Sequence, residues 1–305
     1  MKNYSWNELE TPDWEPVSFA ASCVYEDTLY FSGGWNPLTN SFNSQFWKMN
    51  EHNKWENMEQ ADIWSPRNGH SFTKFNGELW LIGGFNYESR YLGDIWKFNP
   101  QDSSDKWICI SQTNPWEGRE GHSTISYQNS LWIFGGITSS GVKNDIWTSK
   151  DGISWEGSFE TPPWSSRCFH NVIKYMDKLW LIAGSAQEGA LNDMYKSTNG
   201  YEWELVDDNL PFSKRFGAGC CVFDNKLWIV GGSDSKEREF TNDVWVFTEE
   251  NGWSEVKIVS PWTPRWSFNT LQNYTNFLVL LCGGVRFTDR KYSAYSDGWV
   301  LTKIP

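Results

Sequence analysis

A pair of small residues recurs along the chain at a nearly constant spacing, each time directly after a short apolar run. The first residues of the pairs are Gly33, Gly83, Gly135, Ala183, Gly231 and Gly283. Neighbouring pairs are therefore 48 to 52 residues apart. A period of this length is typical of repeat architectures, in which each unit is one supersecondary element packed against its neighbours. We therefore expect an array of similar units.

Tryptophan keeps the same register. The chain holds 22 Trp in 305 residues, and all but Trp35 and Trp266 fall on four recurring positions of the repeat. The excess of Trp is therefore architectural. The aromatic residue downstream of each pair is preceded, two positions earlier, by Asp94, Asp145, Asp193, Asp243 and Asp297, and by Gln45 in the first unit. We expect these aspartates to accept backbone N–H groups in turns.

Each unit contains four short runs with the composition of β-strands. The turns between the third and fourth runs include "KDGISW" and "TNGYEW". Asp-Gly and Asn-Gly supply the positive φ angles that tight hairpins need. Long helical periodicity is absent from the sequence. Four strands in about 50 residues predict one blade of a β-propeller.

These motifs resemble the kelch repeat family. The resemblance rests on the small-residue pair, on the downstream aromatic, and on the Trp that opens the fourth strand, and it covers essentially the whole chain. It implies an all-β, six-bladed kelch β-propeller. The chain ends on a third strand, "GWVLTKIP", and begins on a fourth, "SWNELE". We therefore expect the N-terminal strand to complete the last blade, close the ring and make residues 1–305 a single domain.

Charge and cysteine content narrow the partners and the compartment. The net charge is −12 and the pI is about 4.9, which disfavours nucleic acid and anionic membranes because both need a basic face. No apolar run approaches the ~20 residues of a membrane span, and the first residues lack the apolar core of a signal peptide. The six Cys form no C-x-x-C pair. We expect a cytoplasmic monomer with free thiols and no cofactor.

A Trp-x-x-Arg-x-x-His phrase repeats in "IWSPRNGH", "PWEGREGH" and "PWSSRCFH". It lies on the connection into each innermost strand, so the copies should ring one mouth of the central channel. The arginines are Arg67, Arg119, Arg167, Arg215 and Arg265, with Val17 in the first unit. They could stabilise the blades by donating to carbonyls or by stacking on the Trp three residues earlier. Alternatively, together with Trp116 and Trp164, they could bind an anion.

The histidines of this phrase have two interpretations as well. His70, His122 and His170 open inner strands, where a polar side chain can hydrogen-bond to neighbouring groups. Three imidazoles pointing at the channel axis could instead bind a metal ion. The iron motif E-x-x-x-D-x-x-x-H of kelch-like lyases is absent, because no His has Asp four residues before it. We expect no metal.

The function predicted from these features is binding at an Arg-ringed channel mouth. The partner would be an anionic small molecule or an acidic peptide, held also by the variable loops that carry Arg90 and Tyr91. The alternative is a small-molecule enzyme (an epimerase or mutarotase, a cyclase or a lyase) acting on a carboxylated substrate, with Glu117, Glu120 and His122 moving protons. A purely structural unit would instead turn the arginines into the blades.

Overall fold

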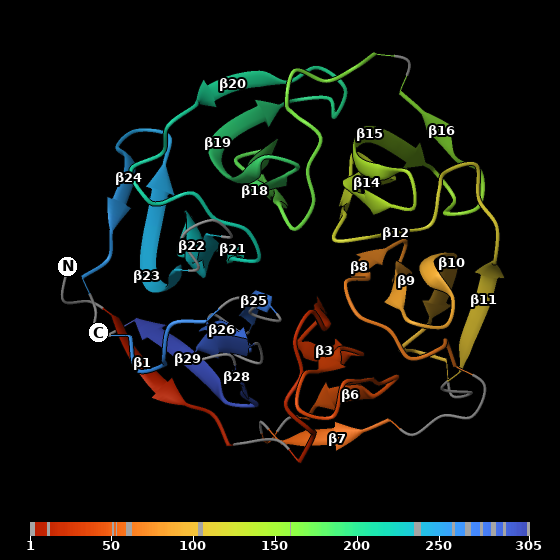
Figure 1. Ribbon diagram of the computed structural model, residues 1–305, viewed down its shortest axis with the longest axis horizontal. Coiled ribbons are helices and arrows are strands. Elements are labelled where there is room, and N and C mark those ends of the chain that lie inside the picture. The colour runs from red at the N-terminus through yellow and green to blue at the C-terminus, as the bar shows by residue number, and fades with distance from the viewer. Residues whose placement is uncertain are drawn as a thin grey trace.

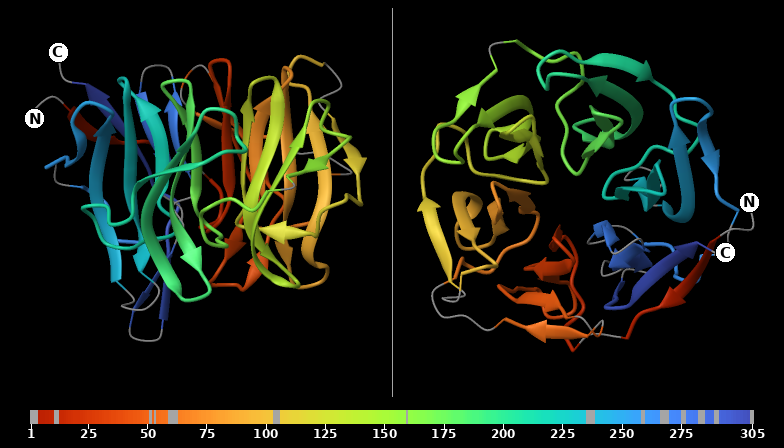
Figure 2. Two further views of the ribbon diagram at one scale, coloured as in Figure 1. Left: turned by 90° about the horizontal axis from the view of Figure 1, so that it is seen from above. Right: turned by 180° about the vertical axis from the view of Figure 1, so that it is seen from behind.

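The strands form a ring of sheets around a central channel. The computed structural model describes residues 4–10, 13–50, 52, 54–58, 63–102, 106–158, 160–234, 239–257, 260–265, 270–274, 277–281, 285–288 and 291–303. All regular elements within these ranges are β-strands. The sheets succeed one another around the ring in chain order (Figure 1). Seen from the side, the strands run between the two faces of the ring (Figure 2).

Within each sheet, consecutive strands pair antiparallel from the channel to the rim. The first three sheets contain β2 (Ala21–Tyr25), β3 (Thr28–Ser32), β6 (Phe46–Met49) and β7 (Trp55–Asn57); β8 (Ser71–Phe75), β9 (Glu78–Asn86), β10 (Arg90–Phe98) and β11 (Trp107–Ser111); and β12 (Arg119–Glu120), β13 (Ser123–Tyr127), β14 (Ser130–Thr138), β15 (Gly141–Ser149) and β16 (Glu156–Gly157). The next three contain β17 (Asn171–Tyr175), β18 (Lys178–Ala186), β19 (Gly189–Ser197) and β20 (Glu204–Asp207); β21 (Gly219–Phe223), β22 (Lys226–Asp234), β23 (Glu239–Thr248) and β24 (Gly252–Glu255); and β25 (Thr270–Tyr274), β26 (Phe277–Leu281), β29 (Gly298–Lys303) and β1 (Tyr4–Glu8). Two small hairpins accompany them, β4 (Trp35–Asn36) with β5 (Ser41–Phe42) and β27 (Val285–Thr288) with β28 (Lys291–Ala294).

The fold is therefore an all-β propeller, but the prediction of six four-stranded blades is wrong. Five sheets have four strands each, and the sheet of residues 119–157 has five. The extra strand is β12, which pairs Arg119 with Thr138 and Glu120 with Ile137. In other sheets the same connection makes only an isolated bridge, such as Asn68 with Phe85. A connection that runs alongside the end of the second strand thus becomes a strand of its own here.

The two ends of the chain meet in one sheet. β1 pairs antiparallel with β29, from Tyr4 with Lys303 to Glu8 with Trp299. The prediction that the N-terminal strand completes the last sheet is confirmed. The Tyr4 hydroxyl also donates to the Asp224 carboxylate at 2.5 Å, which ties β1 to the preceding sheet. This pairing covers the edge of β29 that would otherwise be exposed.

Tryptophan fills the space between the sheets. The aromatic residue at the start of the Trp-x-x-Arg phrase packs edge-on against the Trp that opens the fourth strand. The ring centroids are 4.4 Å apart for Trp64 and Trp107, and 4.6 Å for Trp14 and Trp55 of the first sheet, where Val17 replaces Arg. A further Trp, on the second strand, donates its indole N–H to a carbonyl of its own hairpin, as Trp80 does to Phe75 at 3.0 Å. Trp132, Trp180 and Trp228 make the same bond in their sheets. The repeating Trp positions are therefore core positions.

The small-residue pair lets neighbouring sheets approach closely. Gly83 and Gly84 have φ angles of +64° and +112°, a region that L side chains rarely adopt. A Cβ on Gly83 would lie 2.7 Å from the Arg119 carbonyl oxygen of the next sheet. In a corresponding contact, the Gly136 N–H donates to the Arg167 carbonyl at 2.8 Å. The pair recurs because main chain of the next sheet fills the place of a side chain.

Candidate functional site at the channel mouth

The repeated arginines form a buried layer, which we call the arginine layer: Arg67, Arg119, Arg167, Arg215 and Arg265. Each of these residues is at most 1% exposed. The guanidinium of Arg67 binds both carboxylate oxygens of Asp94, at 2.6 and 2.8 Å. Its remaining N–H groups donate to the Gly83 carbonyl and to the carbonyl and hydroxyl of Ser65. All five donors of Arg67 are therefore satisfied inside the protein.

The other members of the layer repeat this bidentate geometry with the aspartate of their own sheet. The pairs are Arg119 with Asp145, Arg167 with Asp193, Arg215 with Asp243 and Arg265 with Asp297. In four sheets the aspartate also accepts the indole N–H of the Trp two residues later, as in Trp96 to Asp94 at 2.7 Å. The expectation that these aspartates cap backbone N–H groups is thus replaced by side-chain pairing. Burial would raise the pKa of Asp145, but its bonds to Arg119 lower it overall.

Within the described residues, most donors of the arginine layer are already used inside the protein, four of the five in Arg119. Its charges are matched one to one by carboxylates, and the guanidiniums of Arg119 and Arg167 lie 5.6 and 5.9 Å from the rings of Trp116 and Trp164. Those two Trp residues are at most 4% exposed, so neither presents a ligand surface. The geometry is the one predicted for arginines that stabilise blades. In the first sheet, Val17 stands at the position of the arginine and Gln45 at the position of the aspartate, so both members of the ion pair are replaced together.

The three histidines lie between neighbouring sheets. The Cε1 atoms of His70, His122 and His170 point at the glycine pair of the preceding sheet. Nε2 of His70 is 2.9 Å from the Ser32 hydroxyl, and Nε2 of His122 is 3.0 Å from that of Ser71. Burial, aided by Arg119, lowers the pKa of His122 to about 3, which leaves the imidazole neutral. No metal-binding group of three or more His, Cys, Asp or Glu occurs in the described part of the chain.

The channel mouth itself is a ring of main-chain hydrogen bonds, which we call the mouth ring: Phe19, Gly69, Gly121, Phe169 and Gly217. Each of the last four donates its N–H to the carbonyl of the one before it, at 2.8, 2.8, 2.6 and 3.0 Å. All five have φ between 52° and 62°. This layer joins successive sheets directly. It also places two bulky residues in a conformation that normally favours glycine.

The two aromatic members of the mouth ring meet over the channel. The Phe19 and Phe169 rings have centroids 4.8 Å apart, although they come from the first and fourth sheets of the ring. A cavity of 160 Å³ lies at this place, lined by mouth-ring residues and by His70, His122 and His170. The phenylalanines reduce the opening that the channel would otherwise have.

Glu117 and Glu120, the two predicted catalytic carboxylates, have opposite environments. Glu117 accepts from the Lys143 ammonium at 2.8 Å and from the hydroxyls of Ser140 and Thr138. These bonds, led by that of Lys143, lower its pKa to about 2. Glu120 accepts no hydrogen bond from any side chain or backbone group that the structure describes, and burial raises its pKa to about 7. Only Glu120 remains a candidate for binding or proton transfer.

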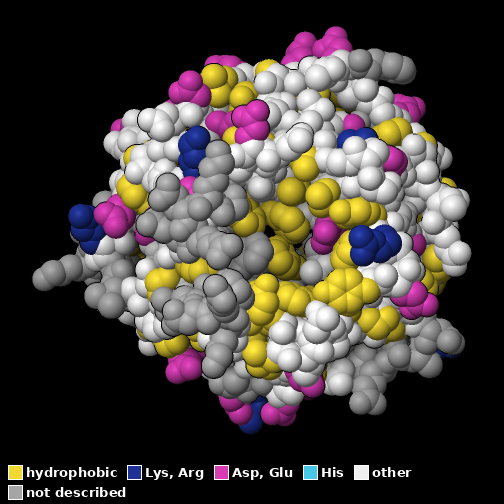
Figure 3. All heavy atoms as spheres, viewed as in Figure 1, with side chains coloured by type: hydrophobic (Ala, Val, Ile, Leu, Met, Phe, Trp, Pro, Cys, Tyr) yellow, Lys and Arg dark blue, Asp and Glu magenta, His cyan; other side chains and the backbone are white. Residues whose placement is uncertain are grey.

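Aromatic side chains continue outward from the mouth over the first two sheets. We call this set the aromatic surface: Trp35, Phe42, Phe85, Tyr87 and Tyr91. The Phe42 ring lies 4.9 Å from that of Tyr87, and Phe85 lies 5.3 Å from Tyr91. Asn40 accepts from both the Trp35 indole and the Tyr87 hydroxyl. Figure 3 shows hydrophobic side chains gathered around the centre of the ring, with an acidic group among them.

The comparisons with known proteins identify the repeat. The KLHDC2/KLHL20/DRC7 Kelch-repeats domain matches residues 19–196, which is more than half of the chain, and a Kelch motif matches residues 214–257. The chain belongs to the kelch-repeat family. The resemblance predicted from the glycine pair and the Trp series is thereby confirmed for the family.

Individual relatives match only parts of the kelch protein. Beta-scruin of Limulus polyphemus is 27% identical over 132 residues, 41% of this chain and 14% of that protein. An F-box/kelch-repeat protein of Arabidopsis thaliana is 33% identical over 106 residues, 32% of this chain and 22% of that protein. The chain thus spans less than a quarter of each relative. The solved structure of YjhT matches with a TM-score of 0.72 and 18% identity over 94% of this chain and 99% of that one, which shows the fold alone.

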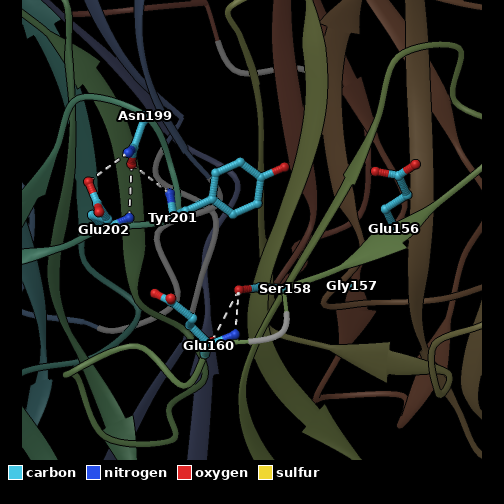
Figure 4. A pocket seen from close by; sticks show the side chains of 7 residues that line it. All are labelled: Glu156, Gly157, Ser158, Glu160, Asn199, Tyr201 and Glu202. Carbon is cyan, nitrogen blue, oxygen red and sulfur yellow. Dashed lines mark hydrogen bonds between the residues drawn. The ribbon is translucent and has the colours of Figure 1, made fainter.

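A larger groove lies on the rim of the kelch propeller, away from the mouth. Its volume is 710 Å³, and Glu156, Glu160 and Glu202 line it together with Tyr201. Tyr201 extends into the space between its own turn and Glu156 (Figure 4). Part of its polar lining is used within the turns themselves, since Asn199 donates to Glu202 and the Ser158 hydroxyl donates to the Glu160 carbonyl. We therefore place the candidate site at the mouth.

Two further features are the lack of a membrane-spanning helix in the described residues and the state of the cysteines. No helix in the described residues is long and apolar enough to cross a membrane. Cys23, Cys109, Cys168, Cys220 and Cys221 are free thiols. Burial raises the pKa of Cys23 and Cys168 to about 12, which makes these two thiols unreactive.

Proposed function

We propose that this kelch propeller is a binding module that holds a segment of a partner protein over the channel mouth. Main-chain pairing places the aromatic surface beside the mouth ring, since Trp35 pairs with Ser18 and Phe85 with Asn68, the residues just before Phe19 and Gly69. Figure 3 shows hydrophobic side chains gathered around the centre of the ring. Tyr87 is 52% exposed, and its ring packs on Phe42 and Phe85. Exposed, mutually packed aromatics are enriched at sites where proteins bind one another. This exposed aromatic cluster is the observation that carries the proposal.

The proposal keeps the binding module predicted from the sequence and moves its contacts. The arginine layer gives little support to an anionic ligand, because each guanidinium already binds a carboxylate. Arg90, on the hairpin between β9 and β10, is exposed and lies 5.3 Å over the Phe85 ring. It is the described arginine best placed to meet an acidic group of a partner. A cytoplasmic setting remains part of the proposal, supported by the free thiols.

The enzyme alternative has weaker support. Of its three candidate groups, Glu117 is held by Lys143, and His122 is bonded to Ser71 between two sheets. Glu120 alone has the raised pKa that suits proton transfer near neutral pH. Proton transfer on a carboxylated substrate would also need a free cation beside Glu120 to hold that substrate. The aromatic surroundings favour binding over such chemistry.

A displayed library of random peptides, selected on the immobilised protein, tests the proposal. We expect selected peptides to bind with an affinity that falls about tenfold in Tyr87→Ala, since truncating an exposed aromatic anchor removes its contacts. Tyr201→Ala is the matched control, because Tyr201 is 41% exposed and lies in the rim groove. Unchanged binding in Tyr87→Ala together with loss in Tyr201→Ala would place the site on the rim and overturn the proposal.

A further inference from the structure

We propose that Glu120 is a recognition site for one organic cation, a lysine ammonium or an arginine guanidinium of the partner segment. The inference rests on the proposed function and deepens it by naming the chemistry at the centre of the face. Its basis is a carboxylate without a partner, placed against the mouth ring and near the Tyr91 ring.

Strand β12 determines where Glu120 points. Successive residues of a strand project to opposite sides. Arg119 projects into its sheet and binds Asp145, so Glu120 projects to the other side, toward the channel. A Cβ on Gly69 would lie 2.8 Å from the Glu120 Oε2 atom. The carboxylate therefore lies on the mouth ring, over a position that has no side chain of its own.

One aromatic residue, Tyr91, interacts with this carboxylate, and Phe169 lies against the residue that follows Glu120. A Cβ on Gly121, the next residue, would lie 2.8 Å from the Phe169 ring, and Phe169 contacts Phe19 over the mouth. Tyr91 lies close enough that the charge of Glu120 adds to the effect of burial in raising its pKa, while Arg90 lowers it. Faces of aromatic rings attract cations. A cation at Glu120 would thus meet a carboxylate with the Tyr91 ring nearby.

The groups around Glu120 leave its charge unmatched within the described residues. The titratable groups that interact with it are the Tyr91 hydroxyl of β10 and the Cys168 thiol on the connection into β17. Arg90 lies beyond Tyr91 and makes no ion pair with Glu120. Glu117, three residues away on the same loop, is paired with a lysine, and the bond from Lys143 is the main cause that lowers its pKa to about 2. Burying a charge is costly unless it is paired, and a partner cation would supply the pair.

The chemistry selects an organic cation over a metal ion. A metal ion needs several carboxylate, imidazole or thiolate ligands, and the described residues contain no such group. A lysine or arginine side chain needs one carboxylate and an apolar wall for its methylenes. The net charge of −12 would also draw a basic segment toward the protein.

The inference can be tested by titrating the protein with n-butylammonium chloride and following the ring resonances of Phe19 and Phe169 in NMR spectra. The uncharged control is n-butanol, which has the same alkyl chain. We expect saturable shifts with the ammonium at pH 8, and shifts at least tenfold weaker with the alcohol or in Glu120→Gln. Because protonation near pH 7 removes the charge, affinity should fall about 30-fold at pH 5.5. Glu117→Gln should bind as the parent does.

Equal binding of the ammonium and the alcohol, or equal binding by Glu120→Gln, would overturn the inference. The wild-type comparison of the two probes at two pH values decides the question even if the variant does not fold. If the ammonium does not bind while selected peptides still depend on Tyr87, the binding module stands and only the role of Glu120 fails. If neither the ammonium nor any Tyr87-dependent peptide binds, both fail.

Discussion

Arg119 and Glu120 are neighbours on β12, yet they belong to two layers with opposite electrostatics. The arginine layer is buried and internally matched, and each guanidinium has an aspartate as its partner. The channel mouth leaves Glu120 without a partner, near the Tyr91 ring. A buried charge that is matched stabilises a scaffold, whereas a half-buried charge such as that of Glu120, left unmatched, is retained at a cost that a ligand can relieve. The repeat therefore supplies the scaffold, and departures from it supply the candidate site.

The largest effect should follow from breaking one pair of the arginine layer. Arg167→Ala leaves Asp193 buried without its partner, because Tyr195 replaces the Trp that donates to the equivalent aspartate elsewhere. We expect a loss of about 3–5 kcal/mol in the free energy of unfolding. Urea denaturation at neutral pH measures it. Arg90→Ala, at an exposed site, should change stability by less than about 0.5 kcal/mol.

The first sheet offers a natural control for this prediction. Val17 and Gln45 stand where the other sheets have Arg and Asp, and Val17 is fully buried. The double variant Arg167→Val with Asp193→Gln copies that arrangement and should recover part of the loss, since no unpaired charge remains. A double variant less stable than Arg167→Ala would show that the two positions are not a unit.

The sequence predicted the scaffold well because the scaffold is what repeats. The spacing of the glycine pairs and the Trp series locates the strands, and the joint loss of Arg and Asp in the first unit is a sequence signal of their pairing. The pairing itself joins residues 26 to 32 positions apart, so no local motif reveals it. Glu120 was selected beside Glu117 for its place next to Arg119. Only the three-dimensional arrangement separates them, because Lys143 reaches one carboxylate and not the other.

A smaller effect should follow from placing a side chain in the mouth ring. Gly121→Ala adds a Cβ 2.8 Å from the Phe169 ring at a φ of +62°. The clash and the conformation together should cost about 2–4 kcal/mol. Thermal and urea denaturation measure it. When Gly121→Ala is instead made in the Phe169→Gly variant and compared with that variant, only the conformational cost, about 1 kcal/mol, should remain. Equal losses in the two backgrounds would show that the phenylalanine ring does not limit the mouth.

Removing the unmatched charge should change stability by less, and in the opposite direction. The pKa of Glu120 is raised to about 7 in the folded protein, so its penalty is present above that pH and absent below the ordinary value near 4.5. Glu120→Gln should therefore gain about 1–3 kcal/mol at pH 8 and nothing at pH 4. Denaturation at the two pH values measures the difference. A loss of stability at pH 8 would mean that the protein already pairs the carboxylate.

The smallest effect belongs to the matched carboxylate on the same loop. The bonds from Lys143, Ser140 and Thr138 lower the pKa of Glu117 to about 2, so they stabilise the fold above pH 4.5 and are lost as the pH falls toward 2. Because the Glu117 side chain is 44% exposed, solvent screens the pair, and Glu117→Gln should cost less than about 1 kcal/mol at pH 7. Denaturation at pH 7 and pH 3 should show this cost shrinking with acid while any gain from Glu120→Gln also disappears. Opposite signs for two glutamates three residues apart would establish that their surroundings, and not the loop they share, determine which one a partner can use. Equal signs would remove the distinction on which the cation site rests.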